Sequence, residues 1–165
     1  MEIKLPIYDW VVRFLNGVLS VVLLAVVDAD FFVAVLKTEV VKEFLSKPEL
    51  VLLSVSFAIA YELGYIVDRL GSLMESIFKR IKAIPFNDDY ALYNKAKADY
   101  PIMSTLQKGY AVSRTQFALF AVFSVVAAIL HQWAFMCSLI FLSGVQYFSW
   151  VKFAKKIVKL MISRE

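Results

Sequence analysis

The stretch from Phe117 to Trp150 reads FALFAVFSVVAAIL, then HQW, then AFMCSLIFLSGVQYFSW, and it decides the fold. It holds two apolar runs, 117–130 and 134–150, separated by three residues. A membrane-spanning helix needs about 20 mostly apolar residues and tolerates about 17 to 25. The second run has that length, and the helix of the first can begin as early as Tyr110. Because three residues leave room only for a tight turn, we predict an antiparallel helical hairpin.

Two further apolar runs, 10–27 and 50–67, precede this hairpin. The whole chain is 61% hydrophobic and 19% charged, whereas soluble domains are about 45–50% apolar and about 25% charged. A soluble fold of 165 residues could not bury so much apolar surface. In a bilayer that surface faces lipid, and helices satisfy their own backbone hydrogen bonds. We therefore predict an all-α integral membrane protein built as a four-helix bundle.

The four runs divide the chain into parts. The expected division is a transmembrane hairpin over 1–67 with an outer loop at 28–49, a small helical cytoplasmic cap at 68–116, a second transmembrane hairpin at 117–150, and a basic cytoplasmic tail at 151–165. Within the outer loop, an apolar patch at 31–36 is too short to span again. It either extends the first helix beyond the bilayer or lies on the outer surface.

The cap is expected to be helical. Apolar residues at spacings of three and four continue the second span as a helix to about residue 84, where Pro85 ends it. Asn87 is a plausible N-cap for a second helix through Leu92, and Pro101 interrupts the chain again before a last helix enters the third span.

The distribution of Lys and Arg gives the orientation. With Arg13 counted in the N-terminal segment, that segment holds two, the second connection eight and the tail five. The first connection holds three and the third none. Basic residues collect on the cytoplasmic side, so we predict that the N- and C-termini both lie in the cytoplasm.

Catalytic motifs are not evident. The sequence lacks HExxH, GxSxG and P-loop patterns. His131 is the only histidine, and it more plausibly caps the hairpin than acts as a base. An Arg-x4–6-His ribonuclease pattern would need Arg at 124–126, which are Ser, Val and Val. We expect no enzyme, no catalytic residue, no metal site and no cofactor.

Charged residues within the spans are the best candidates for a site, because an ionisable group at membrane depth usually faces a partner or water. Arg13 and Glu62 lie near the inner ends of the first two spans, which places them at similar depth. An Arg13–Glu62 ion pair is one interpretation. In the other, Arg13 reaches lipid phosphates and Glu62 turns toward the cytoplasmic rim.

Polar side chains also recur at helical spacing along these spans, at Asn16, Ser20, Tyr65 and Arg69. Small and polar stripes commonly hold transmembrane helices together. The alternative is that one stripe lines an aqueous path in a homo-oligomer. A similar stripe follows the fourth span, at Ser143, Gln146 or Tyr147, and Trp150. Because a single copy would have difficulty burying the stripes of the first, second and fourth spans together, we expect a homo-oligomer.

The tail places its lysines on one helical face, at Lys152, Lys155, Lys156 and Lys159. This pattern suits a helix on anionic headgroups, at about 1 kcal/mol for each lysine. A cytosolic acidic partner could use the same face. No aromatic side chains interleave with these lysines, so nucleic acid is not indicated.

One resemblance concerns residues 60 to 120. The stretch YELGYIVDRL at 61–70, LYxxAx4P at 92–101 and SRxxF at 113–117 resemble small four-helix bacterial membrane proteins of anti-phage defence loci. CRISPR-accessory membrane proteins and the Kiwa membrane subunit are examples. The resemblance implies an oligomeric inner-membrane component that perturbs the membrane or forms a pore. It equally admits a non-conducting sensor or scaffold that recruits a cytosolic protein of the same locus through its basic cap.

Overall fold

The computed structural model describes residues 7–85 and 89–163, and this part of the chain is helical without any strand. Its helices, in chain order, are α1 (Ile7–Val27), α2 (Ala29–Leu36), α3 (Glu39–Leu45), α4 (Glu49–Arg80), α5 (Tyr90–Asp99), α6 (Ile102–Ile129) and α7 (Trp133–Ile162). Four of them, α1, α4, α6 and α7, are long and apolar enough to cross a membrane. The predictions of an all-α fold and of four candidate spans are therefore confirmed.

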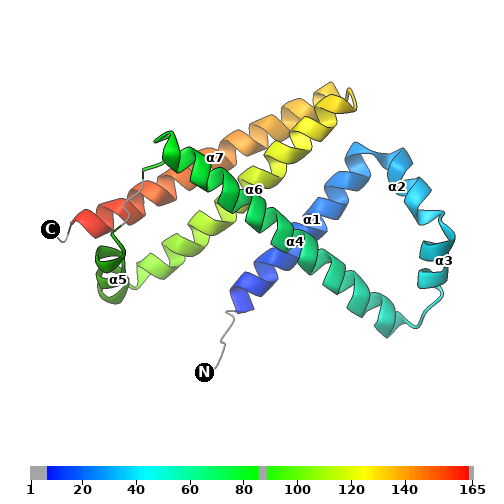
Figure 1. The fold of residues 1–165 in the computed structure, drawn as a ribbon, viewed down its shortest axis with the longest axis horizontal. Coiled ribbons are helices and arrows are strands. Elements are labelled where there is room, and N and C mark those ends of the chain that lie inside the picture. The colour runs from blue at the N-terminus through cyan, green and yellow to red at the C-terminus, as the bar shows by residue number, and fades with distance from the viewer. Residues whose placement is uncertain (1–6, 86–88, 164–165) are drawn as a thin grey trace.

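In Figure 1, α1 and α6 run from lower left to upper right, α7 returns antiparallel to α6, and α4 runs across α1 and α6 from lower right to upper left. The end of α7 and helix α5 lie toward one end, which we call the cap end. Helices α2 and α3 and the α6–α7 turn lie toward the other, the arm end. The tight hairpin is present, and Gln132 Nε2 donates a hydrogen bond to the carbonyl oxygen of Val27. This bond ties the hairpin turn to the end of α1.

Helix α4 lies diagonally across α1 and α6 instead of alongside them (Figure 1). Its buried residues form one stripe, at Ala60, Gly64, Val67 and Gly71. Because three of these have a small side chain or none, the backbone of α4 can approach two other helices closely at the crossings.

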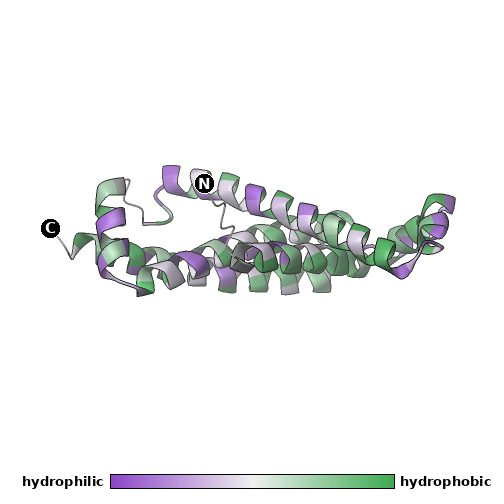
Figure 2. Ribbon diagram, turned by 90° about the horizontal axis from the view of Figure 1, so that it is seen from below, coloured by the Kyte–Doolittle hydropathy of each residue, from purple (hydrophilic) through white to green (hydrophobic). Residues whose placement is uncertain are grey.

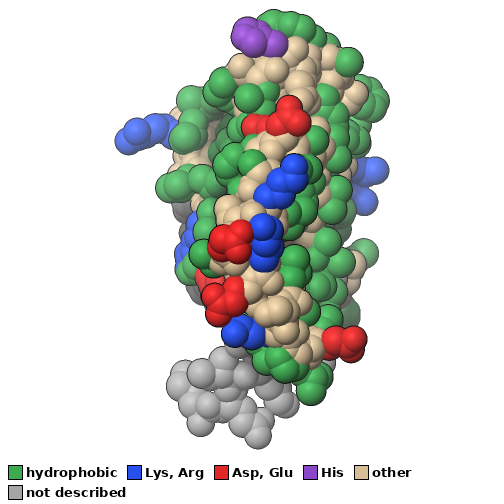
Figure 3. Space-filling view, turned by 90° about the vertical axis from the view of Figure 1, so that its right-hand side faces the viewer, with side chains coloured by type: hydrophobic (Ala, Val, Ile, Leu, Met, Phe, Trp, Pro, Cys, Tyr) green, Lys and Arg blue, Asp and Glu red, His purple; other side chains and the backbone are tan. Residues whose placement is uncertain are grey.

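Helices α2 and α3 form an arm that contains no buried residue. Asp28 interrupts the chain after α1, and its side chain accepts a hydrogen bond from the Phe31 amide at 2.9 Å. The apolar patch at 31–36 is thus a separate helix and not an extension of α1, because this N-cap starts a new helix. Acidic and basic side chains follow one another along the arm end (Figure 3).

The cap differs from its prediction at its helix boundaries. Helix α4 ends at Arg80, several residues before Pro85, because Lys82 adopts a left-handed conformation with φ of 55°. Asn87 lies outside the described residues, and Asp89 is the N-cap of α5, accepting from the amides of Ala91 and Leu92. The expected tail helix is present as the last turns of α7.

Apolar packing is concentrated in three places. Leu23, Val67, Leu119 and Leu139 join α1, α4, α6 and α7. Nearer the cap end, an aromatic cluster consists of Phe78, Tyr110, Phe117, Tyr147 and Trp150. At the cap end itself, α5 packs onto α6 and α7 through Ala96, Met103 and Met161. The outer surfaces of the long helices stay largely apolar, with hydrophilic residues recurring in the C-terminal half of α4, in α5 and in the arm (Figure 2).

Candidate functional site

The site begins at the crossing of α1 and α4, where two glycines remove the side chains that would separate the backbones. A Cβ added to Gly17 would overlap the carbonyl oxygen of Ala60, and one added to Gly64 would overlap that of Arg13. Farther along α4, a Cβ on Gly71 would meet Thr115 Cα of α6 at 3.3 Å. These contacts fix the rotation of α4 about its own axis.

This rotation decides which acidic residue of α4 meets Arg13. Asp68 follows Gly64 by four residues and so lies about 40° from it around the helix, whereas Glu62 lies about 160° away at 100° per residue. The carboxylate of Asp68 lies 3.7 Å from Arg13 Nη2. Glu62 is exposed and forms no ion pair with any described residue. The predicted Arg13–Glu62 pair is therefore wrong, and Asp68 takes the place of Glu62.

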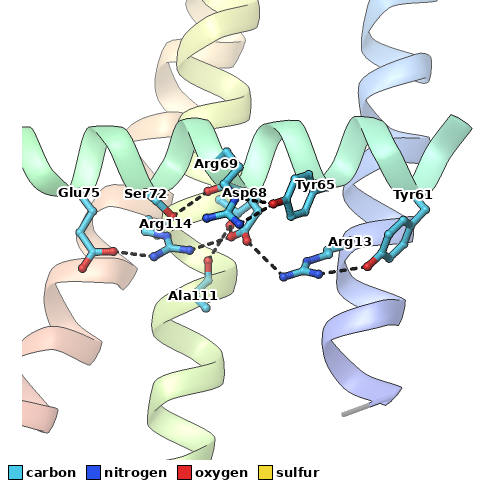
Figure 4. Close-up of polar contacts among 10 residues, drawn as sticks. Arg13, Tyr61, Tyr65, Asp68, Arg69, Ser72, Glu75, Ala111 and Arg114 are labelled. Atoms are coloured by element: carbon cyan, nitrogen blue, oxygen red, sulfur yellow. Dashed lines mark hydrogen bonds and ion pairs between the residues drawn. The ribbon is translucent and has the colours of Figure 1, made fainter. Parts of the chain in front are cut away.

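Aromatic side chains of α4 complete the surroundings of Arg13. Its Nη1 donates to the Tyr61 hydroxyl at 3.1 Å, and its guanidinium lies 5.3 Å from the centre of the Tyr65 ring. Arg69 donates to the Tyr65 hydroxyl at 2.9 Å, and its guanidinium lies 4.8 Å from the centre of the same ring. Figure 4 shows these groups converging between α1 and α4. Hydrogen bonding and cation–π attraction together hold Arg13 toward α4.

Arg114 of α6 supplies the second half of the cluster. Its two terminal nitrogens bind different carboxylates, Asp68 at 2.7 Å and Glu75 at 2.6 Å. Glu75 also pairs with Lys79 one turn later on α4. The side chains of Arg114 and Glu75 are only 15% and 12% exposed, so solvent screens this pair little.

We call Arg13, Asp68, Glu75 and Arg114 the ion cluster. It joins α1, α4 and α6, and Thr115 adds a hydroxyl 3.1 Å from Asp68 Oδ1. A buried carboxylate that loses its cationic partner is strongly destabilising. The three helices are therefore coupled electrostatically at the place where their backbones cross.

The residues of the predicted polar stripe differ in how deeply the structure buries them. Asn16 and Ser20 are buried within the chain, at 3% and 7% exposure, and Ser20 donates to the Asn16 carbonyl at 2.8 Å. Tyr65 is half-buried, while Arg69 is exposed. Since the chain buries Asn16 and Ser20 by itself, these two residues give no reason to expect a second copy.

The tail lysines share one exposed face of α7, as predicted: Lys152, Lys155, Lys156 and Lys159. On the opposite face, Ala154 and Met161 are buried, and Met161 packs against Ala96 of α5. The apolar side of this helix thus supports the cap, and only its lysine side is open to headgroups or a partner.

A pocket of about 440 Å³ lies beside the ion cluster, between α1, α4, α5 and α6. Four basic residues line it, Arg13, Lys97, Lys108 and Arg114, together with one acidic residue, Asp68. The lining therefore carries three more positive than negative charges, and Arg114 is also paired with Glu75 outside the lining. The described residues contain no group of three His, Cys, Asp or Glu side chains placed to hold a metal ion.

Reasoning from the sequence missed Asp68, Glu75 and Arg114. Asp68, Glu75 and Lys79 follow each other at spacings of seven and four, which puts them on one face of α4. That spacing, together with an arginine just before the third apolar run, was the available signal. No protein-family model, characterised protein or solved structure matches this chain.

Proposed function

We propose that α1, α4, α6 and α7 cross a bacterial inner membrane, with the cap end in the cytoplasm. The excess of Lys and Arg at the cap end supports this orientation. Alkaline carbonate should leave the chain in the membrane. Reporter fusions after residues 40, 95 and 165 should read outside, inside and inside, and an outside reading at 95 would overturn the topology.

We propose further that the chain is a homo-oligomeric effector that perturbs the membrane. The observation that carries this proposal is the position of Glu62 on α4. It lies between Ile59 and Ile66, which are 52% and 53% exposed, on a face that none of the described helices covers. A carboxylate facing lipid is costly, and a second copy of the chain would remove it from lipid.

The neighbouring residues on α4 suit such a contact. Ser54 and Ala58 precede Glu62 at spacings of four and are exposed as well. Small side chains allow two helices in a membrane to approach closely. In an oligomer, copies of Glu62 would then come together around a common axis, where a ring of carboxylates can attract cations. An anti-phage role follows from the resemblance of residues 60 to 120.

Ion flux through liposomes that contain the full chain tests this function. We expect flux that Glu62→Gln reduces and that Glu43→Gln, the same change on the exposed arm, leaves unaltered. A monomeric protein that passes no ions would contradict the effector proposal. Phage challenge of cells that express the chain with its neighbouring genes tests the defence role separately.

The alternative is a non-conducting sensor or scaffold. The open lysine face of α7 and the cap built on α5 favour this function, because they offer a cytosolic protein a basic surface. Under this alternative, exchanging Lys155 and Lys156 for Gln should abolish recruitment of the partner. Membrane potential would then not respond to Glu62→Gln.

A further inference from the structure

We infer that the pocket between α1, α4, α5 and α6 binds the phosphate of an anionic phospholipid. The inference rests on the proposed insertion in a membrane but not on oligomerisation or conduction. It begins with charge: Arg13, Lys97, Lys108 and Arg114 line the pocket, and Asp68 is the single acidic residue there. Basic pockets between transmembrane helices on the cytoplasmic side suit anionic headgroups.

Two buried donors provide an independent observation. Asn16 is 3% exposed, and its Nδ2 has no hydrogen-bond partner among the described residues. The same holds for Nε of Arg114, whose terminal nitrogens already bind Asp68 and Glu75. Both side chains line the pocket. Because a buried donor without an acceptor is costly, the pocket fits a ligand that brings acceptor oxygens.

The remaining polar lining has the same character. Ser104, Gln107 and Thr115 add hydroxyl and amide groups that can donate hydrogen bonds. A phosphodiester offers several acceptor oxygens and one negative charge, which matches these donors and the surplus of basic residues. Charge-assisted hydrogen bonds of this kind are stronger than neutral ones.

The surface of α1 favours lipid as the source of the phosphate. Val11, Leu15, Val18, Val22 and Val26 form one exposed apolar stripe that runs from the level of the pocket toward the arm end. Their spacings of three and four keep them on a single helical face. At 100° per residue the stripe lies about 130° around α1 from Val12, Arg13 and Asn16, which line the pocket. It therefore places lipid tails beside α1 near the pocket but not inside it.

Native mass spectrometry of the full chain, titrated with phosphatidylglycerol, tests the inference. The exposed lysines Lys97 and Lys108 are changed together to Gln, and the control changes Lys152 and Lys155 to Gln, with the same loss of charge away from the pocket. We expect the pocket variant to bind roughly thirtyfold more weakly, about fivefold for each lysine. The control should bind like the unchanged protein.

A second variant, Asn16→Leu, removes the buried donor and should also weaken binding, with the helical content kept. Equal binding by the pocket variant and the control would overturn the inference. The inference would also be overturned if inorganic phosphate, added to the protein in bilayers of phosphatidylcholine alone, stabilised the protein as much as phosphatidylglycerol does. The ligand would then be a free anion and not a lipid. Release of the protein by alkaline carbonate would instead refute insertion itself.

Discussion

The contact between α1 and α4 and the contact between α6 and α7 differ in how closely the backbones of the two helices approach. At the first, Gly17 and Gly64 let one backbone rest on another. At the second, Trp150 is fully buried among rings, with its centroid 5.7 Å from that of Phe117 and 5.9 Å from that of Tyr110. The first contact therefore has no room for a larger side chain at its glycines. The second depends on the large Trp150 ring that fills the space between the helices.

The glycine at the first contact offers the largest effect. Gly64→Leu forces a side chain into the backbone of Arg13, so α1 and α4 must separate, and the ion cluster loses its geometry. We expect loss of the folded protein, measured as loss of a monodisperse peak in detergent.

Gly144 is the matched control on α7, because a Cβ there would meet nothing within 4 Å. Gly144→Leu should leave the peak unchanged. Equal damage from the two substitutions would mean that glycine at the crossing has no special role.

Next in size is the removal of the arginine that links α4 and α6. Arg114→Met leaves Asp68 and Glu75 with one cationic partner fewer at a poorly exposed site, which should cost about 3–5 kcal/mol of unfolding free energy. Arg114→Lys keeps the charge but cannot bind both carboxylates through a planar fork. Its free energy of unfolding should therefore lie between that of Arg114→Met and that of the unchanged protein. Denaturation in mixed micelles gives the order, and equal losses for Lys and Met would contradict it.

The aromatic contact should respond more mildly to a change of shape. Trp150→Phe keeps a ring but leaves unfilled space, and we expect a loss of about 1–2 kcal/mol, typical of single core substitutions. Phe148→Leu is the control, since Phe148 is 72% exposed on the same helix. The two variants are compared by thermal unfolding, and a larger loss for Phe148→Leu would contradict the assigned packing.

The smallest effect on stability is expected at Glu62. Because it is exposed and has no ion-pair partner among the described residues, Glu62→Gln should leave the thermal midpoint of the isolated protomer unchanged. Its effect should instead be on the mass of the assembly or on ion flux. A loss of stability as large as that of Arg114→Met would show that Glu62 belongs to the internal contacts after all.

Helix positions could be predicted from the sequence because apolar run length is a local property. The runs at 10–27, 50–67 and 134–150 all lie within observed helices, as does the lysine face of α7. The partner of Arg13 is different in kind. Asp68 and Glu62 lie less than two helical turns apart on α4, so either could lie near the level of Arg13. Only the glycine contact decides which of them faces α1. Periodicity defines a helix face but not the helix that covers it.

The arm and the pocket were missed for related reasons. Helices α2 and α3 are short, and each starts at a side-chain N-cap, Asp28 or Thr38. Such caps are weak signals in a segment where acidic, basic and apolar residues alternate without a clear period. The pocket is formed by four helices. Its basic residues are spread from Arg13 to Arg114, so no spacing in the sequence connects them.

Because α4 is one long, uninterrupted helix, it has a mechanical consequence. Its 32 residues form one rod, about 48 Å long at 1.5 Å per residue, and its close backbone contacts are near the middle, at Gly64 and Gly71. Such a rod is a lever with its fulcrum on α1 and α6. One limb carries α3, and the other ends beside Phe78, whose ring packs on Trp150 at 5.8 Å. We therefore expect a sideways pull on the arm to move Lys79 and Arg80 in the opposite direction and to press on the aromatic rings.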